Sequence, residues 1–179
     1  MSTYYTGKRA SRYNRTWRTF LQKTLPATLS AIDVASSQQR ASTRERPLRI
    51  LDAACGTGLL LEQLTHLFPS AELYGIDESQ AVLAQAVQLL HDRPHVHLVQ
   101  ASLRGGETAG LPFALASFDL ITCTNTWHYL NDPVATLAGL GRLLVSGGQV
   151  VLPHTEVDNA DNSPTRLTAW ETLLILPYI

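Results

Sequence analysis

The spacing of apolar positions changes repeatedly after residue 47. Short, nearly continuous apolar stretches alternate with longer stretches in which apolar residues recur every three or four positions. The first kind predicts buried strands and the second predicts amphipathic helices. The expected strands cover residues 48–54, 71–77, 95–100, 118–124 and 149–153. The expected helices cover residues 59–68, 79–90 and 132–144, and Pro133 suits the first turn of the last one.

This alternation predicts an α/β fold with a doubly wound, mainly parallel sheet that is covered by helices on both faces. Ligands of such sheets bind at the carboxyl ends of the strands, near the point where the strand order reverses. Only 26 residues follow Pro153, enough for about one further helix or strand. We therefore expect C-terminal strands to be missing, through either truncation or a shortened sheet.

The first 46 residues predict a separate N-terminal feature. Tyr13, Trp17, Phe20 and Leu21 recur at helical spacing among basic residues, which indicates an amphipathic helix. Residues 35–47 have no apolar periodicity and predict a linker. We expect residues 1–46 to form a helical cap and linker, and residues 47–179 to form the α/β part of one structural domain. The first part carries a charge of +7 and the second −8.

Composition limits the class of protein. The 179 residues are 45% hydrophobic and 16% charged, as in one soluble globular domain. No apolar run reaches the roughly 20 residues of a membrane span, and the N-terminus has no hydrophobic signal core, so we expect a cytoplasmic protein. The net charge of −1 and the lack of a basic, aromatic strip in the α/β part argue against nucleic acid as a partner. Cys55 and Cys123 lack metal-ligand spacing, and we expect two buried thiols and no metal.

The stretch ILDAACGTG, residues 50–58, joins the first strand to the first helix through a glycine turn. Gly56 and Gly58 allow the backbone to approach a ligand closely. A dinucleotide site adds a third glycine where Leu61 stands here. Asp52 would repel a pyrophosphate and would attract an ammonium or sulfonium group. These residues favour a nucleoside with a cationic amino-acid arm, which describes S-adenosylmethionine, while an NAD(P)-dependent oxidoreductase remains an alternative.

The chain resembles the class I S-adenosylmethionine-dependent methyltransferases between about Leu48 and Leu152. LDAACGTG resembles their first motif, YGIDES resembles the segment that clamps the ribose, and LLVSGGQVVL resembles the turn before the fifth strand. The resemblance implies a Rossmann-like fold and S-adenosylmethionine as the cofactor. It assigns the methionine end of the cofactor to Asp52, Ala54, Gly56 and Gly58, and the ribose hydroxyls to Asp77.

The resemblance also implies contacts with the rest of the cofactor. Ser102, followed by Leu103, stands where many relatives carry an acid that bonds the adenine amino group, and we expect both residues to contact the cofactor. Thr124 and Asn125, at the end of the fourth strand, are candidates for the methionine arm. Their alternative role is to satisfy the strand end. Ala54 stands where many relatives have glycine.

The acceptor side is less defined. His128 resembles a histidine often found after the fourth strand and is the candidate general base, with a packing role as the alternative. His154, just beyond the fifth strand, is a candidate for a substrate role, with a loop histidine as the alternative. Tyr13, Trp17 and Trp127 are candidates for lining the acceptor pocket or packing in the core. We expect residues 4–25 to close over the cofactor as a lid.

The function that follows is in-line methyl transfer to an unidentified small-molecule acceptor. A homodimer is the candidate assembly. A non-catalytic subunit that retains the methyltransferase fold is an alternative, as is the oxidoreductase.

Overall fold

The fold is built on a five-stranded sheet in which all neighbouring strands are parallel. A computed structural model describes residues 18–43, 45–103, 110–126 and 130–152. The strand order is β3-β2-β1-β4-β5. The strands are β1 (Arg49–Ala53), β2 (Glu72–Asp77), β3 (Val96–Gln100), β4 (Phe118–Thr122) and β5 (Leu144–Val151). All five strands predicted from the apolar pattern are present.

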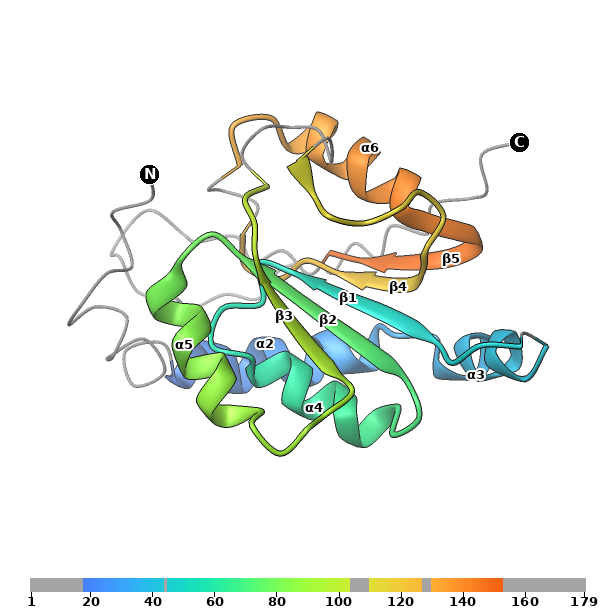
Figure 1. Cartoon of the computed structure of the whole chain (residues 1–179), viewed down its shortest axis with the longest axis horizontal. Coiled ribbons are helices and arrows are strands. Elements are labelled where there is room, and N and C mark those ends of the chain that lie inside the picture. The colour runs from blue at the N-terminus through green and yellow to red at the C-terminus, as the bar shows by residue number, and fades with distance from the viewer. Residues whose placement is uncertain (1–17, 44, 104–109, 127–129, 153–179) are drawn as a thin grey trace.

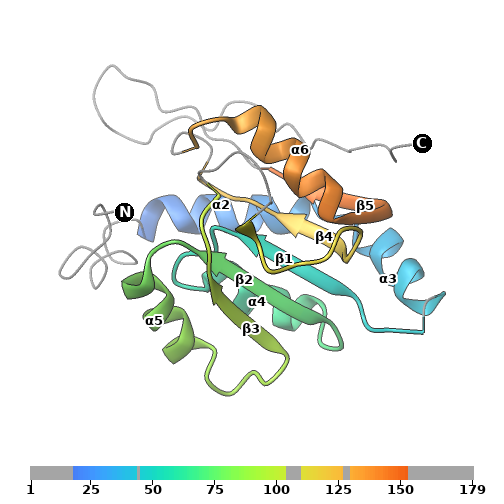
Figure 2. The same ribbon diagram turned by 45° about the horizontal axis from the view of Figure 1, so that its top comes forward.

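Helices cover both faces of this sheet. They are α2 (Arg18–Ser30), α3 (Val34–Ser42), α4 (Leu59–Leu67), α5 (Gln80–Leu89) and α6 (Pro133–Leu143). Figures 1 and 2 show α2, α4 and α5 on one face and α6 on the other. Successive strand residues point to opposite faces, so Ile50 packs in the core beside α4 and α5, while Leu51 packs in the core beside α6. The doubly wound α/β prediction is confirmed.

The strand order shows at which edge of the sheet a ligand is expected to bind. This edge, formed by the carboxyl ends of β1, β2 and β4, is called the functional edge below. β1 lies between β2 and β4, and the chain leaves β1 toward β2 through α4 and later returns to the other side of β1 as β4. The carboxyl ends of β1, β2 and β4 therefore meet at the point where the strand order reverses, which is where ligands bind in open parallel sheets.

The last strand begins earlier than its apolar pattern predicts. β5 starts at Leu144, which pairs with Phe118, and the register shifts before Gln149 pairs with Leu120. Gly147 lies within this irregularity at a φ of 74°, a backbone conformation that glycine adopts without strain. The glycines that indicated a turn before the strand lie inside the strand.

The expected linker is wrong over most of its length, because Val34–Ser42 forms the helix α3. The side chain of Asp33 accepts hydrogen bonds from the backbone N–H and the hydroxyl of Ser36, which caps the first turn. The Asp33 N–H in turn donates to Oε1 of Gln149, whose Nε2 donates to the carbonyl of Ala31. A local cap and a contact with β5 thus stabilise a helix that shows no apolar stripe.

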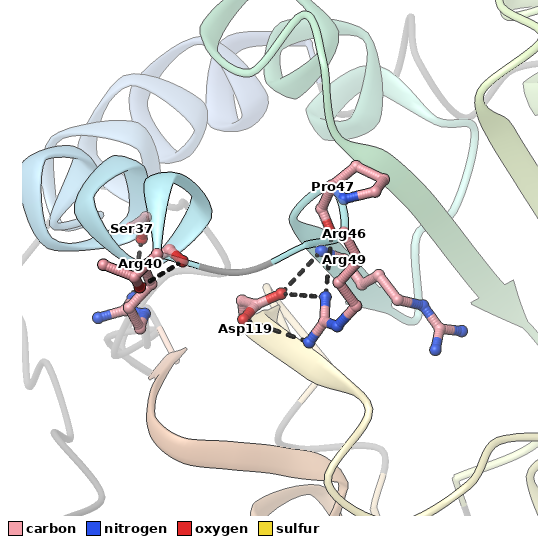
Figure 3. A network of polar contacts seen from close by, with 7 residues as sticks. Ser37, Arg40, Arg46, Pro47, Arg49 and Asp119 are labelled. Atoms are coloured by element: carbon pink, nitrogen blue, oxygen red, sulfur yellow. Dashed lines mark hydrogen bonds and ion pairs between the residues drawn. The ribbon is translucent and has the colours of Figure 1, made fainter.

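Residues between α3 and β1 are tied to the sheet through a buried carboxylate. Asp119 has no exposed surface and accepts hydrogen bonds from Nη1 of Arg46 at 2.8 Å and the backbone N–H of Arg49 at 2.9 Å (Figure 3). This ion pair lies at the amino ends of β1 and β4, opposite the functional edge. Its contacts satisfy a buried charge that would otherwise be costly.

In the described ranges, no helix has both the length and the hydropathy that a membrane span needs.

Candidate functional site

The turn between β1 and α4 adopts a left-handed backbone at three positions. Ala54, Gly56 and Gly58 have φ values of 64°, 57° and 83°. A Cβ atom built on Gly56 would meet no atom within 4 Å, whereas one on Gly58 would lie 2.9 Å from Cδ1 of Leu90 and 3.1 Å from Cβ of Ala86. Gly56 therefore borders space that a ligand can enter, and Gly58 allows α4 and α5 to pack together. Ala54 tolerates a conformation that costs a residue with a Cβ about 1 kcal/mol.

The missing third glycine of a dinucleotide motif has a structural counterpart on the neighbouring strand. Leu61 is completely buried, and its Cδ1 lies 2.6 Å from where a Cβ on Gly75 of β2 would be. The strand glycine thus makes room for the helix leucine. The helix and the sheet approach closely in both cases. In a dinucleotide motif the glycine lies in the helix, whereas here it lies in the strand β2.

Asp77 ends β2 and joins the glycine turn to the next helix. Its Oδ2 accepts a hydrogen bond from the Gly56 N–H at 3.0 Å, and its Oδ1 accepts one from the Ser79 N–H at 2.8 Å. Burial raises the pKa of the Asp77 carboxyl, and the two backbone donors act in the opposite direction. Because each carboxylate oxygen accepts more than one hydrogen bond, Asp77 can also bind a vicinal diol.

Asp52 is buried more deeply than a direct contact with a cationic ligand requires. The residue is 1% exposed, and its Oδ1 accepts a hydrogen bond from the Thr122 hydroxyl at 2.8 Å. Burial raises the pKa of Asp52 to about 7, with a smaller contribution from the charge of Asp77. From beneath the turn, Asp52 can therefore influence the site through the electrostatic field of its carboxylate. Cys55 and Cys123 are buried free thiols, as expected, and burial raises the pKa of Cys123 to about 12.

The end of β4 brings a third group to the same edge. Asn125 has a φ of 56°, and its Nδ2 donates to the Thr24 hydroxyl of α2 at 3.4 Å. Its Oδ1 is buried, and among the residues that the structure describes it has no hydrogen-bond partner. A buried acceptor without a donor is unfavourable, so Oδ1 is suited to receive an N–H from a ligand. Thr124 is half-buried beside it, and its carbonyl accepts a hydrogen bond from the Thr126 hydroxyl.

The structure places Ser102 and Leu103 differently from one another. Ser102 is exposed after β3 and donates through its hydroxyl to Oε2 of Glu78 at 3.1 Å. Leu103 is half-buried and packs against the core beneath α6, and its carbonyl accepts a hydrogen bond from the Thr136 hydroxyl. Contact of these two residues with a cofactor stays a prediction.

Five candidates on the acceptor side lie outside the residues that the structure describes. They are Tyr13, Trp17, Trp127, His128 and His154.

Three described residues at the site were not predicted: Thr24, Glu78 and Thr122. Thr24 and Thr122 give no signal because one lies on a distant helix and the other is an ordinary strand residue. Glu78 follows Asp77 in YGIDES, and the sequence alone does not indicate its contact with Ser102, which follows another strand.

The residues at this edge fit S-adenosylmethionine. Gly56 borders space for a ligand, Asp77 offers acceptors for a diol, and the unpartnered Oδ1 of Asn125 offers an acceptor for an ammonium group. Within the described residues, no group of three His, Cys, Asp or Glu side chains is arranged to hold a metal ion.

Comparison with known proteins shows the family. Residues 51–152 match the methyltransferase domain family, and this match covers more than half of the chain. The chain therefore belongs to that family. The match begins within β1 and ends just after β5, so it includes the glycine turn, Asp77 and the end of β4.

Individual relatives agree with this result. An uncharacterized protein of Synechococcus sp. is 40% identical over 128 residues, 68% of this chain and 29% of the relative. The malonyl-[acyl-carrier protein] O-methyltransferase of Bacillus cytotoxicus is 30% identical over 137 residues, 76% of this chain and 46% of the relative. The chain thus spans less than half the length of each of these two relatives. The crystal structure of an S-adenosylmethionine-dependent methyltransferase from Mesorhizobium loti has the same Rossmann-like fold, with a TM-score of 0.56 and 23% identity over 71% of this chain and 51% of that one.

Proposed function

We propose that this chain binds S-adenosylmethionine across the carboxyl ends of β2, β1 and β4 and directs its methyl group to a small-molecule acceptor. The observation that carries the proposal is the geometry at Gly56. Its left-handed backbone borders unfilled space, and its N–H is held by the carboxylate of Asp77. Membership of the methyltransferase domain family supports the assignment and disfavours the oxidoreductase alternative.

The cofactor would lie with its ribose at Asp77 and its amino-acid arm toward Asn125. The bound cofactor supplies a methyl group already activated by a sulfonium centre. The protein therefore needs mainly to position the reactants in line and to exclude water. The described residues do the first of these tasks at the cofactor end. His128, the candidate general base, and His154, a candidate for a substrate role, lie outside the described residues.

The acceptor that we propose is a small molecule or a small group on a carrier. The relative from Bacillus cytotoxicus is named for methylating malonyl-[acyl-carrier protein], which supports this size class. The chain's net charge of −1 agrees with it, because a nucleic-acid substrate favours a strongly basic surface.

The cofactor class is tested by thermal shift with S-adenosylmethionine, S-adenosylhomocysteine, NAD and NADP. We expect the first two to raise the melting temperature and the nicotinamide cofactors to leave it unchanged. A shift with NAD alone would contradict the proposal. Binding without methyl transfer to any acceptor would instead favour the non-catalytic subunit.

Replacing Asp77 by Ala tests the ribose assignment. We expect the affinity for S-adenosylhomocysteine to fall by about 2–4 kcal/mol, because two charge-assisted hydrogen bonds are lost. The variant also loses the acceptors for the Gly56 and Ser79 N–H groups, so it should stay folded with reduced stability. Calorimetry measures the first effect and denaturant unfolding the second. Glu72→Gln, at the other end of β2, is the control, and unchanged affinity in Asp77→Ala would place the ligand elsewhere.

A further inference from the structure

We infer that Glu78, positioned by Ser102, is the residue that recognises the amino group of the adenine ring. This inference rests on the proposed function, since it concerns one part of the same cofactor. It moves the polar contact with the base from Ser102, in the segment after β3, to Glu78, the residue after β2. Two observations carry it: the order of polar groups along the functional edge, and the hydrogen bonds around Glu78.

The order of groups along the edge sets the direction of the ligand. The unpartnered Oδ1 of Asn125 lies at the end of β4 and marks the amino-acid arm. Gly56 follows at β1, and Asp77, the ribose acceptor, follows at β2. With the arm at β4 and the ribose at β2, the base extends toward β3, because β3 is the next strand in the sheet.

The two acids that end β2 serve opposite sides of that strand. Asp77 turns toward β1, where its carboxylate holds the Gly56 N–H. Glu78 turns toward β3, where its carboxylate accepts the Ser102 hydroxyl proton at 3.1 Å and its backbone carbonyl accepts from Nε2 of Gln100 at 3.1 Å. The Ala101 N–H donates to the Asp77 carbonyl at 3.1 Å and continues the β2–β3 pairing to this point. These contacts fix Glu78 beside the expected place of the base.

The chemistry of the pair favours Glu78 over Ser102 as the main acceptor. The adenine amino group is a donor and needs an acceptor. Ser102 uses its only proton on Glu78, so its oxygen keeps a neutral acceptor role. A carboxylate accepts more strongly than a hydroxyl because the bond is charge-assisted. Ser102 is thus a positioning residue. The carboxylate of Glu78 accepts the hydrogen bond that Ser102 would accept only weakly.

A carboxylate here also sets specificity. In a 6-oxo purine the amino donor is replaced by a carbonyl oxygen, which would face the carboxylate as a second acceptor. We expect wild-type protein to bind S-adenosylhomocysteine at least about tenfold more tightly than S-inosylhomocysteine, the effect of one lost hydrogen bond to a charged group.

The test is calorimetric titration of both ligands into wild type, Glu78→Gln, Glu78→Ala and Ser102→Ala. We expect both Glu78 variants to lose most of the preference for the adenine ligand, because the adenine amino group loses its charged acceptor and the inosine oxygen no longer faces a carboxylate. Ser102→Ala should lose part of it. Glu72→Gln, on the same strand and bonded to His97 at its far end, should keep the wild-type ratio.

The outcomes separate the two proposals. An unchanged adenine-to-inosine ratio in Glu78→Ala, with wild type binding S-adenosylhomocysteine, overturns the role of Glu78 and leaves the proposed function standing. Failure of wild type to bind either ligand overturns the proposed function and this inference with it. Melting curves of the variants distinguish lost binding from lost folding, and Glu78 is accessible enough for substitution to be tolerated, being half-buried.

Discussion

Single residues at the functional edge bury polar groups at a cost in stability. Asp52 is a carboxyl group enclosed by the sheet, and the Thr122 hydroxyl is the hydrogen-bond donor that the structure gives it. The sequence indicated Asp52 because an acid beside a glycine turn suits a cationic ligand. It could not show how deeply Asp52 is buried, because burial depends on β4 and β2, which are distant in the chain. An apolar residue at this place would avoid the cost of burying a polar group.

Asp52 should make the protein less stable as pH rises. Its folded pKa is about 7, whereas its pKa in the unfolded chain is near 3.8. Between these values the folded state binds more protons, so the free energy of unfolding falls as pH rises from about 4 to about 7 and then levels off. The raised pKa of Asp77 acts in the same direction.

Replacing Asp52 by Asn tests this expectation. The variant keeps an oxygen for the Thr122 hydroxyl and loses the titration. We expect equal stability at pH 5 and a gain over wild type of about 1–3 kcal/mol at pH 8, measured by urea unfolding at both values. Asp92→Asn on an exposed turn should keep the wild-type slope. A full wild-type slope in Asp52→Asn would show that other groups cause the pH dependence.

Elements with their own apolar pattern could be predicted from the sequence, and elements stabilised by distant contacts could not. β1, β2 and β4 combine apolar strand patterns with boundary residues, and all three are present. α3 was missed because its stability depends on the Asp33 cap and on Gln149, which lies 116 residues away from Asp33. Likewise, Gly75 gave no sign in the sequence that it makes room for Leu61. At the site, Asp77 was predictable from its motif, whereas Glu78 and Thr24 depend on tertiary contacts.

The contact between α4 and α5 separates the roles of the two turn glycines. Ala at position 58 would combine a φ of 83° with contacts of 2.9 and 3.1 Å to Leu90 and Ala86, so we expect Gly58→Ala to cost about 2 kcal/mol or more of stability. Ala at position 56 would meet no atom and should cost about 1 kcal/mol from the backbone alone.

Cofactor binding should show the opposite ranking for these variants, once each is compared while folded. We expect Gly56→Ala to lose at least about 1.4 kcal/mol of affinity, a factor of ten, because the new methyl group occupies the ligand's space. Denaturant unfolding and calorimetry on the same preparations measure both effects. Equal affinity in wild type and Gly56→Ala would mean that the space over Gly56 is not the cofactor site.

At the scale of the whole molecule, a side-chain contact between described residues joins the helix α2 to the site. α2 packs on the core through Leu25 and Leu29, and the Thr24 hydroxyl accepts a hydrogen bond from Nδ2 of Asn125 at 3.4 Å. Asn125 therefore faces α2 with its amide nitrogen, and its oxygen, which has no partner among the described residues, is the proposed acceptor for the ligand. A ligand that binds this oxygen orders the same side chain that holds α2. The lid over residues 4–25 stays a prediction, and residues 18–25 of it lie in α2.

This connection predicts that the cofactor stabilises α2 as well as the turn. In hydrogen exchange, S-adenosylhomocysteine should slow the amides of residues 24–30 together with those around Gly56. Thr24→Val keeps the shape of a side chain that is 1% exposed and removes the acceptor for Asn125. We expect it to abolish the added protection in α2, to retain the protection around Gly56, and to weaken cofactor affinity by about 0.5–1.5 kcal/mol, the value of one neutral hydrogen bond.

Thr28→Val is the matched control for this change. Thr28 lies one turn further along α2, is equally buried, and its hydroxyl donates only to the Thr24 carbonyl among the contacts that the described residues show. The substitution should therefore leave both protection patterns and the affinity close to wild type. Exchange in α2 that is equally fast with and without cofactor in the wild-type protein would contradict the connection. It would also remove the support that α2 gives to a lid, because a helix that does not respond to the cofactor through Thr24 has no described contact through which it could close over the site.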